Sequence, residues 1–147
     1  MATYIAGSKN PAPAGPYSHA VQAGPFIATA GQVGVDPRTS LPVGEGVAEQ
    51  TRQAIRNLAA VLEESGADLT SIFRVGVFLT DEADFEVMNA VYREMMPSPF
   101  PARTTVFAKL MPGLKVEIDA LAYANVPGAG AGATTTAAAT NSQAPRT

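Results

Sequence analysis

The stretch VAEQTRQAIRNLAAVLEES at residues 47–65 decides the fold, because it carries the clearest helical pattern in the chain. Its small and apolar residues recur every three or four positions: Val47, Thr51, Ala54, Ile55, Leu58, Val61 and Leu62. This spacing lines them along one face of a helix, with most of the charged residues on the other face. Gly66 follows directly and suits the left-handed position at which many helices end. The pattern predicts an amphipathic helix that packs against a second layer.

Runs typical of β-strands precede this helix. Residues 3–6, 17–23 and 26–31 are predicted strands, and Gly24-Pro25 supplies the turn of a hairpin between the second and the third. Residues 35–46 contain several glycines and prolines and are predicted to form a loop.

A strand, a second helix and two further strands are predicted after it. Residues 72–79 are rich in β-branched and aromatic residues, and alternation predicts that one face of this strand carries Phe73, Val75, Val77 and Leu79. Thr80 or Asp81 is predicted to cap the second helix. Its apolar stripe comprises Phe85, Met88, Tyr92 and Met95. The last strands are expected at residues 103–109 and 114–125.

The predicted element order is therefore β-β-β-α-β-α-β-β, which is an α+β fold. Each helix has one apolar stripe, so both are expected to pack on one face of the sheet. Leu121 and the aromatic-rich strand at residues 72–79 leave apolar side chains for the other face. An exposed apolar sheet face usually marks an interface, which predicts a homo-oligomer.

The composition of the chain limits the classes of function that it can have. The 147 residues carry a net charge of −3 and no cysteine, which disfavours nucleic-acid binding and excludes thiol catalysis and disulfides. No apolar stretch approaches membrane-spanning length, so a cytoplasmic protein without a membrane partner is expected. Residues 1–126 are predicted to form one domain. Residues 127–147 are dominated by Ala, Thr and Gly, and they are predicted to be a low-complexity, disordered tail.

Arg103 and Glu117 are the leading candidates for chemistry. Arg103 begins a strand after a proline-stiffened loop, and a guanidinium matches a carboxylate with forked hydrogen bonds. A structural ion pair with Glu117 or Asp119 is the commoner role for such an arginine. Glu117 is expected on the sheet face opposite the core, either in solvent or partly desolvated, where it could activate water.

Three further polar residues have less distinctive patterns. Tyr17 could close a pocket or cover the end of the sheet, and Asn89 lies at the edge of the second helix's apolar stripe. His19 is the only histidine, and a surface position is expected for it. One histidine without a matching carboxylate pattern predicts no metal site.

Four ordered motifs connect the chain to a known family: PAGPYS at residues 13–18, AGQV at 30–33, PARTTV at 101–106 and VEIDA at 116–120. They resemble those of the RidA (YjgF) family of reactive-intermediate deaminases, over residues 5–124. The resemblance implies a chorismate-mutase-like fold and a homotrimer with active sites between subunits. It also implies hydrolysis of 2-iminopropanoate and 2-iminobutanoate to 2-oxo acids and ammonia, without a cofactor.

The same resemblance assigns roles to six residues. Arg103 is expected to bind the substrate carboxylate together with the backbone N–H of Thr105, and Glu117 to orient the hydrolytic water. The remaining residues form the pocket: Tyr17 and the Gly31 backbone line it, and Asn89 supports it.

Two positions depart from the family pattern. Many members have Ser where this chain has Ala30, and Cys where it has Thr105. These changes leave open a pathway-specific deaminase that acts on another enamine or amino-acid derivative. A trimer that binds 2-oxo acids without turnover is a further alternative.

Overall fold

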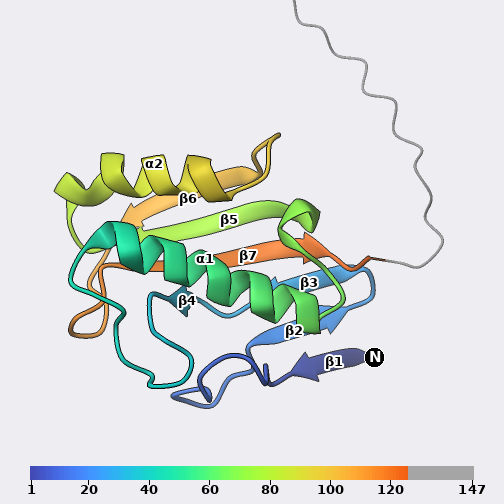
Figure 1. Ribbon diagram of the computed structural model, residues 1–147. Coiled ribbons are helices and arrows are strands. Elements are labelled where there is room, and N and C mark those ends of the chain that lie inside the picture. Colours follow the sequence, from blue (N-terminus) through green and yellow to red (C-terminus); the bar gives the residue numbers. More distant parts are fainter. Residues whose placement is uncertain (126–147) are drawn as a thin grey trace, which may run out of the picture.

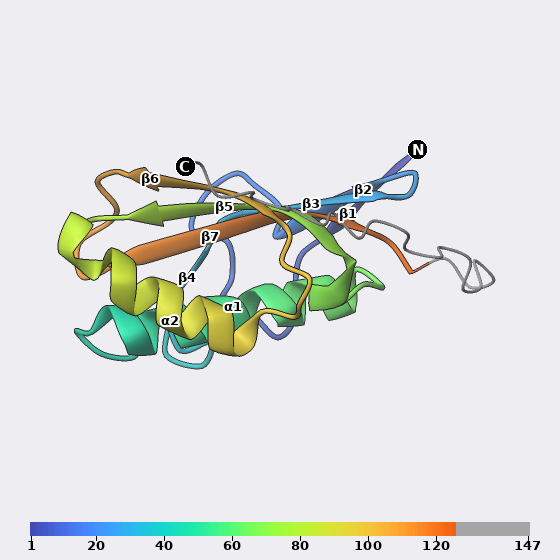
Figure 2. The same cartoon turned by 90° about the horizontal axis from the view of Figure 1, so that it is seen from above.

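Two helices lie on the same side of a seven-stranded sheet in the computed structural model, which describes residues 1–125 (Figures 1 and 2). The predicted tail, residues 127–147, lies outside the described residues. The α+β fold and the placement of both helices on one face are confirmed. The strands are β1 (Ala2–Ile5), β2 (Ala20–Ala23), β3 (Phe26–Thr29), β4 (Gln32–Val33), β5 (Ile72–Leu79), β6 (Ala102–Phe107) and β7 (Val116–Tyr123).

The sheet is mixed. Its strand order is β1-β2-β3-β7-β5-β6, and β4 also pairs with β7. The β5–β6 pair is parallel and the other pairs are antiparallel. Because β5 lies between β6 and β7, its pairing with each of them relates the residues of β6 to those of β7.

Helix α1 (Val47–Glu64) is the element that the sequence predicted best. Ala54, Ile55, Leu58, Val61 and Leu62 are fully buried against the sheet. Gly66 follows the helix with a φ of 74°, a left-handed conformation that costs glycine little. The Ala67 N–H donates to the Leu62 carbonyl at 2.8 Å, which satisfies an open acceptor at the helix end.

Helix α2 (Phe85–Met95) begins later than predicted. Asp81 caps the short 3₁₀ turn Glu82–Asp84 instead, where its carboxylate accepts the Ala83 N–H at 2.9 Å. The predicted cap of α2 by Thr80 or Asp81 is therefore wrong, because a separate turn intervenes. The predicted stripe is confirmed: Met88 and Tyr92 are buried, and Phe85 and Met95 pack against the core.

Two details of the sheet differ from the sequence prediction. β4 was not predicted, because two residues are too few to show a period. Phe73 was expected on the same face as Val75, but an irregularity in the β5–β7 pairing lies between Ile72 and Arg74. Such a bulge reverses the alternation at that point, and Phe73 is exposed.

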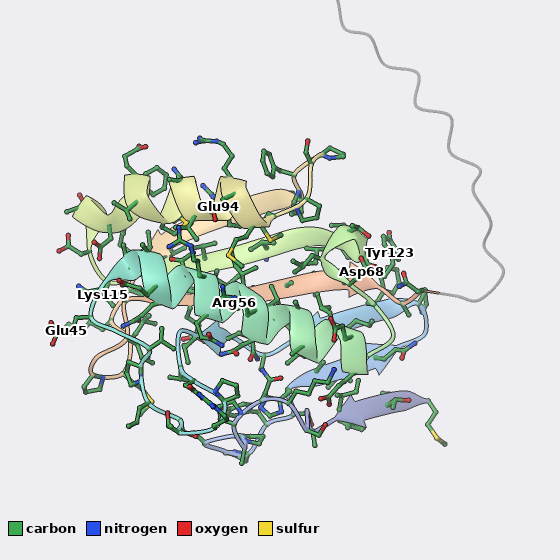
Figure 3. The ribbon with its side chains drawn as sticks, viewed as in Figure 1. Glu45, Arg56, Asp68, Glu94, Lys115 and Tyr123 are labelled. Carbon is green, nitrogen blue, oxygen red and sulfur yellow. The ribbon has the colours of Figure 1, made fainter. Side chains whose placement is uncertain are left out.

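The sheet face away from the helices carries an exposed aromatic cluster of Phe26, Phe73 and Tyr123. Their ring centroids are 4.8 Å apart for Phe73 and Tyr123 and 5.4 Å apart for Phe26 and Tyr123. Figure 3 labels Tyr123, beside the end of β7. No helix of residues 1–125 covers this face, which we call the open face.

Candidate active site

Arg103 is held by two side chains of α2. Its backbone lies opposite buried Val75 on β5, so its side chain points to the helix-covered side of the sheet. One Nη atom donates to Asn89 Oδ1 at 2.7 Å, and the guanidinium carbon lies 4.8 Å from the centre of the Tyr92 ring. A hydrogen bond and a cation–π contact together fix the orientation of the guanidinium.

No carboxylate of the described residues neutralises Arg103. The ion pairs of residues 1–125 are Lys9–Glu63, Arg38–Asp36, Arg52–Glu94 and Lys115–Asp84. The alternative prediction, a structural ion pair of Arg103 with Glu117 or Asp119, is therefore wrong within one chain. The remaining N–H donors of Arg103 are available to an anion from outside the described chain.

A small, open cavity lies beside Arg103. Its volume is about 300 Å³, and it is lined by Asn89, Tyr92, Arg93, Phe100, Pro101 and Arg103. Thr105 lies two residues further along β6, opposite Val77, and so it shares the face of Arg103. We call Arg103, Asn89 and Thr105 the arginine half of the candidate site.

Glu117 lies on the open face of the sheet. It pairs with Phe78 on β5 and with Val33 on β4, and its carboxyl is about half buried. Burial raises the pKa of Glu117 above its usual range, and the nearby charge of Asp119 raises it further. A carboxyl in such surroundings is suited to accept a proton or to hold a water molecule.

Gly31 lies directly against this carboxyl. A Cβ atom built on Gly31 would overlap Oε1 of Glu117, so only glycine leaves room for the observed position. Gly31 and Tyr17 also line one cavity of about 300 Å³. The Tyr17 hydroxyl accepts the Ala14 N–H at 3.1 Å. We call Glu117, Gly31 and Tyr17 the glutamate half of the candidate site.

The Arg103 and Glu117 side chains lie on opposite faces of the sheet. Arg103 shares the side of Val75, whereas Glu117 is opposite Phe78, whose side chain points the other way. A single chain therefore does not bring the Arg103 and Glu117 side chains together. The six residues named from the sequence form two groups of three.

His19 is the one candidate whose predicted position is wrong. Its side chain is only 4 % exposed, and Nδ1 contacts the Ala6 carbonyl oxygen beneath the turn at Gly7. The loop between β1 and β2 folds over the imidazole, which strand alternation could not predict. Within residues 1–125, no group of three or more His, Cys, Asp or Glu residues could hold a metal ion.

A buried amide network supports the glutamate half, and sequence reasoning missed it. Asn10 Nδ2 donates to Gln32 Oε1 at 3.0 Å and to the Asn57 carbonyl at 3.1 Å. Asn57 Nδ2 donates to the carbonyls of Val33 and Val35, each at 3.0 Å. These bonds hold the segment that directly follows Gly31. One feature of the sequence could have indicated this network: Asn57 occupies a position on the buried face of α1, where an apolar residue is usual.

Comparison with known proteins identifies relatives along almost all of the described chain. A family model described as endoribonuclease L-PSP matches residues 7–124. A human protein named 2-iminobutanoate/2-iminopropanoate deaminase is 38% identical over 119 residues, which cover 80% of this chain and 87% of that protein. A RutC family protein of Pyrococcus abyssi is 43% identical over 116 residues, covering 78% and 91% of the two chains.

Solved structures agree with the fold. RidA from an Antarctic Psychrobacter is 37% identical with a TM-score of 0.79, and the match covers 82% of this chain and 98% of that one. The E. coli protein TdcF, solved with bound serine, is 30% identical with a TM-score of 0.78 over the same shares of the two chains. In residues 1–125, no helix combines the length and the apolar character needed to cross a membrane.

Proposed function

This chain belongs to the RidA (YjgF) family, whose family model is described as endoribonuclease L-PSP, and we propose that it hydrolyses 2-iminopropanoate and 2-iminobutanoate to 2-oxo acids and ammonia. The observation that carries this proposal is the guanidinium of Arg103. It is fixed by Asn89 and Tyr92, lines a small cavity and has no carboxylate partner among the described residues. A fixed, unpaired guanidinium suits the carboxylate of a small acid. The backbone N–H of Thr105 assists it in this proposal.

The reaction requires one water molecule and no covalent intermediate with the protein. The water oxygen adds to the imine carbon, the C–N bond then breaks, and ammonia leaves as the 2-oxo acid forms. In this mechanism Glu117 orients the water, accepts its proton during the attack and passes that proton to the nitrogen, so that ammonia can leave and the carboxylate is regenerated. The protein contributes mainly orientation, because an imine already hydrolyses in water.

The mechanism requires two copies of the chain. The Arg103 and Glu117 side chains lie on opposite faces of one sheet, so a site that uses both takes Arg103 from one subunit and Glu117 from its neighbour. The exposed rings of Phe26, Phe73 and Tyr123 give the open face the apolar character of an interface. We therefore propose a homotrimer with a site at each subunit boundary.

An assay with freshly made imine tests the proposed activity. An amino acid oxidase generates 2-iminopropanoate from alanine, and semicarbazide traps the imine that survives. The expected result is that the protein diverts most of the imine from the trap. Measurable binding of 2-oxo acids with no diversion would identify a binding protein, and diversion only of other imines would identify a pathway-specific deaminase.

The net charge of −3 opposes ribonuclease activity, although the family model carries the word endoribonuclease. Binding to an RNA backbone depends on a basic surface that neutralises phosphates. The described residues give no specific observation in favour of a nuclease, so we do not propose one.

Substituting Gly31 with alanine is expected to disable the site without unfolding the protein. The added methyl group would take the place of Oε1 of Glu117, so the carboxyl must turn away from its water. We expect kcat to fall about a hundredfold, the range for a misplaced acid–base group. Steady-state kinetics and a melting curve check this. Gly24→Ala is a control, because nothing lies near a Cβ at that turn, although its φ of 60° costs some stability. Unchanged kcat in Gly31→Ala would contradict the role of Glu117.

The pH dependence of kcat/KM is expected to follow the ionisation of Glu117. Because burial and Asp119 raise its pKa, activity should decline with falling pH earlier than for an ordinary glutamate. Asp119→Asn removes the neighbouring charge, yet its amide oxygen can still accept the Gly76 N–H that Asp119 accepts at 3.1 Å.

In the Asp119→Asn variant, the decline of kcat/KM at acidic pH should therefore occur at lower pH than in the wild type. Burial still keeps the pKa of Glu117 above its ordinary range. Substrate ionisation is common to both proteins, so the difference between the two profiles isolates the enzyme group. An unchanged decline, or one that occurs at higher pH, would contradict this assignment.

A further inference from the structure

The Arg103 cavity presents more cationic donors than a single carboxylate needs. Arg93 lines the same cavity, which has a volume of about 300 Å³. Asn89 and Arg93 are four residues apart on α2, so they lie on one face of the helix. The substrate carboxylate is already assigned to Arg103, so the guanidinium of Arg93 is a surplus positive charge at the site.

No surface ion pair explains Arg93. It is absent from the ion pairs of residues 1–125, whereas its neighbour Glu94 is paired with Arg52 at 3.1 Å. Figure 3 labels Glu94 on α2. An exposed arginine without a carboxylate partner, beside a concave site, is free to bind an anion.

Tyr92 also lines this cavity, and its ring lies against the Arg103 guanidinium. Tyr92 is only 5 % exposed, and its hydroxyl has no hydrogen-bond partner. A buried polar group without a partner is costly, and native proteins rarely leave one. Burial also raises the pKa of Tyr92, so the hydroxyl keeps its proton and remains a donor. Because its oxygen is closed off from solvent, however, the hydroxyl is not one of the donors that an acceptor in the open cavity can reach.

We propose that this cavity binds a second acidic group, so that the protein accepts 2-imino acids that carry a carboxylate on the side chain, such as the imines of aspartate and glutamate. Arg103 holds the carboxylate next to the imine carbon. Arg93 holds the side-chain carboxylate. This inference rests on the proposed deaminase function and names a substrate class for the same site.

The test compares two imines in the same trapping assay. Oxidases supply the imine of aspartate and the imine of alanine, and the wild type is compared with Arg93→Gln, Arg93→Lys and the control Arg56→Gln. Arg56 is an exposed arginine of α1, labelled in Figure 3. It tests whether loss of any surface charge has the same effect.

Arg93→Gln is expected to lower kcat/KM for the aspartate imine about ten- to hundredfold, the range for a charge-assisted hydrogen bond. The same variant should stay within about threefold for the alanine imine, because that substrate has no side-chain charge to pair. Arg93→Lys should retain part of the activity on the aspartate imine, and Arg56→Gln all of it. Equal effects of Arg93→Gln on the two imines, or none on either, would overturn the proposal.

A binding experiment separates this inference from the proposed activity. Calorimetry compares oxaloacetate with pyruvate, which differ by one carboxylate. Tighter binding of oxaloacetate that Arg93→Gln removes supports the second subsite even if the wild type turns over neither imine, which would disprove only the deaminase function. Equal affinity of the wild type for the two acids would overturn the subsite itself.

Discussion

Arg103→Ala is expected to lose nearly all imine hydrolysis while the protein stays folded and assembled. The variant removes the only cationic group that Asn89 and Tyr92 hold in place, and it leaves Asn89 Oδ1 without its donor. Truncating one partner of a buried, charged hydrogen bond costs about 2–5 kcal/mol, so kcat/KM should fall about thirtyfold to several thousandfold.

Arg103→Lys should restore little of this activity. Lysine keeps the positive charge, but it lacks the planar fork that can donate to Asn89 and to a carboxylate at the same time. The trapping assay measures the loss, and sedimentation equilibrium shows whether the oligomer persists. Arg56→Ala is the matched control on the exposed side of α1. If Arg103→Ala diverted as much imine as the wild type, the protein would still be a deaminase. Arg103 would then not be the residue that binds the substrate carboxylate.

Mixing two inactive variants is expected to restore activity, which is the sharpest test of a shared site. Arg103→Ala retains Glu117, and Glu117→Gln retains Arg103, so each variant has one intact half. The two side chains face opposite sides of the sheet, and an intact site forms only where the variants are neighbours. In a ring of subunits mixed at random in equal amounts, about one quarter of the boundaries carry both intact halves.

The experiment unfolds the two variants together, refolds them and measures imine diversion. Activity should rise from near background to about one quarter of the wild type. Each variant refolded alone is the control and should stay inactive. If the mixture remains as inactive as its components while forming mixed oligomers, the two residues do not act at one shared site.

Much of the fold could be predicted because its patterns are local. The helical period of residues 47–65 and the alternation of Val116, Ile118, Ala120 and Ala122 each repeat over several turns or pleats. Both elements appear where expected, and these four residues of β7 are buried on the helix side. The alternation also assigned Glu117 to the opposite face, which is confirmed.

The details that failed depend on contacts between distant segments. β4 exists because Gln32 and Val33 meet β7, and the position of Phe73 follows from a bulge that its pairing with β7 creates. His19 is buried because the β1–β2 loop closes over it. None of these contacts produces a repeating apolar pattern within its own segment, so the local sequence cannot predict it.

For the candidate site too, the sequence determined one part and the contacts between distant segments decided the rest. The sequence by itself determined the residue types, a guanidinium at 103 and a carboxylate at 117, and the family motifs that connect them to imine chemistry. It did not determine the face of Arg103, because β6 is an edge strand whose sequence, ARTTVF, shows no alternation of apolar and polar residues. Only the parallel register with β5 decided that Arg103 points toward α2, where Asn89 and Tyr92 hold it. That register is a contact between segments far apart in the chain, and it alone places the arginine and the glutamate on opposite faces of the sheet.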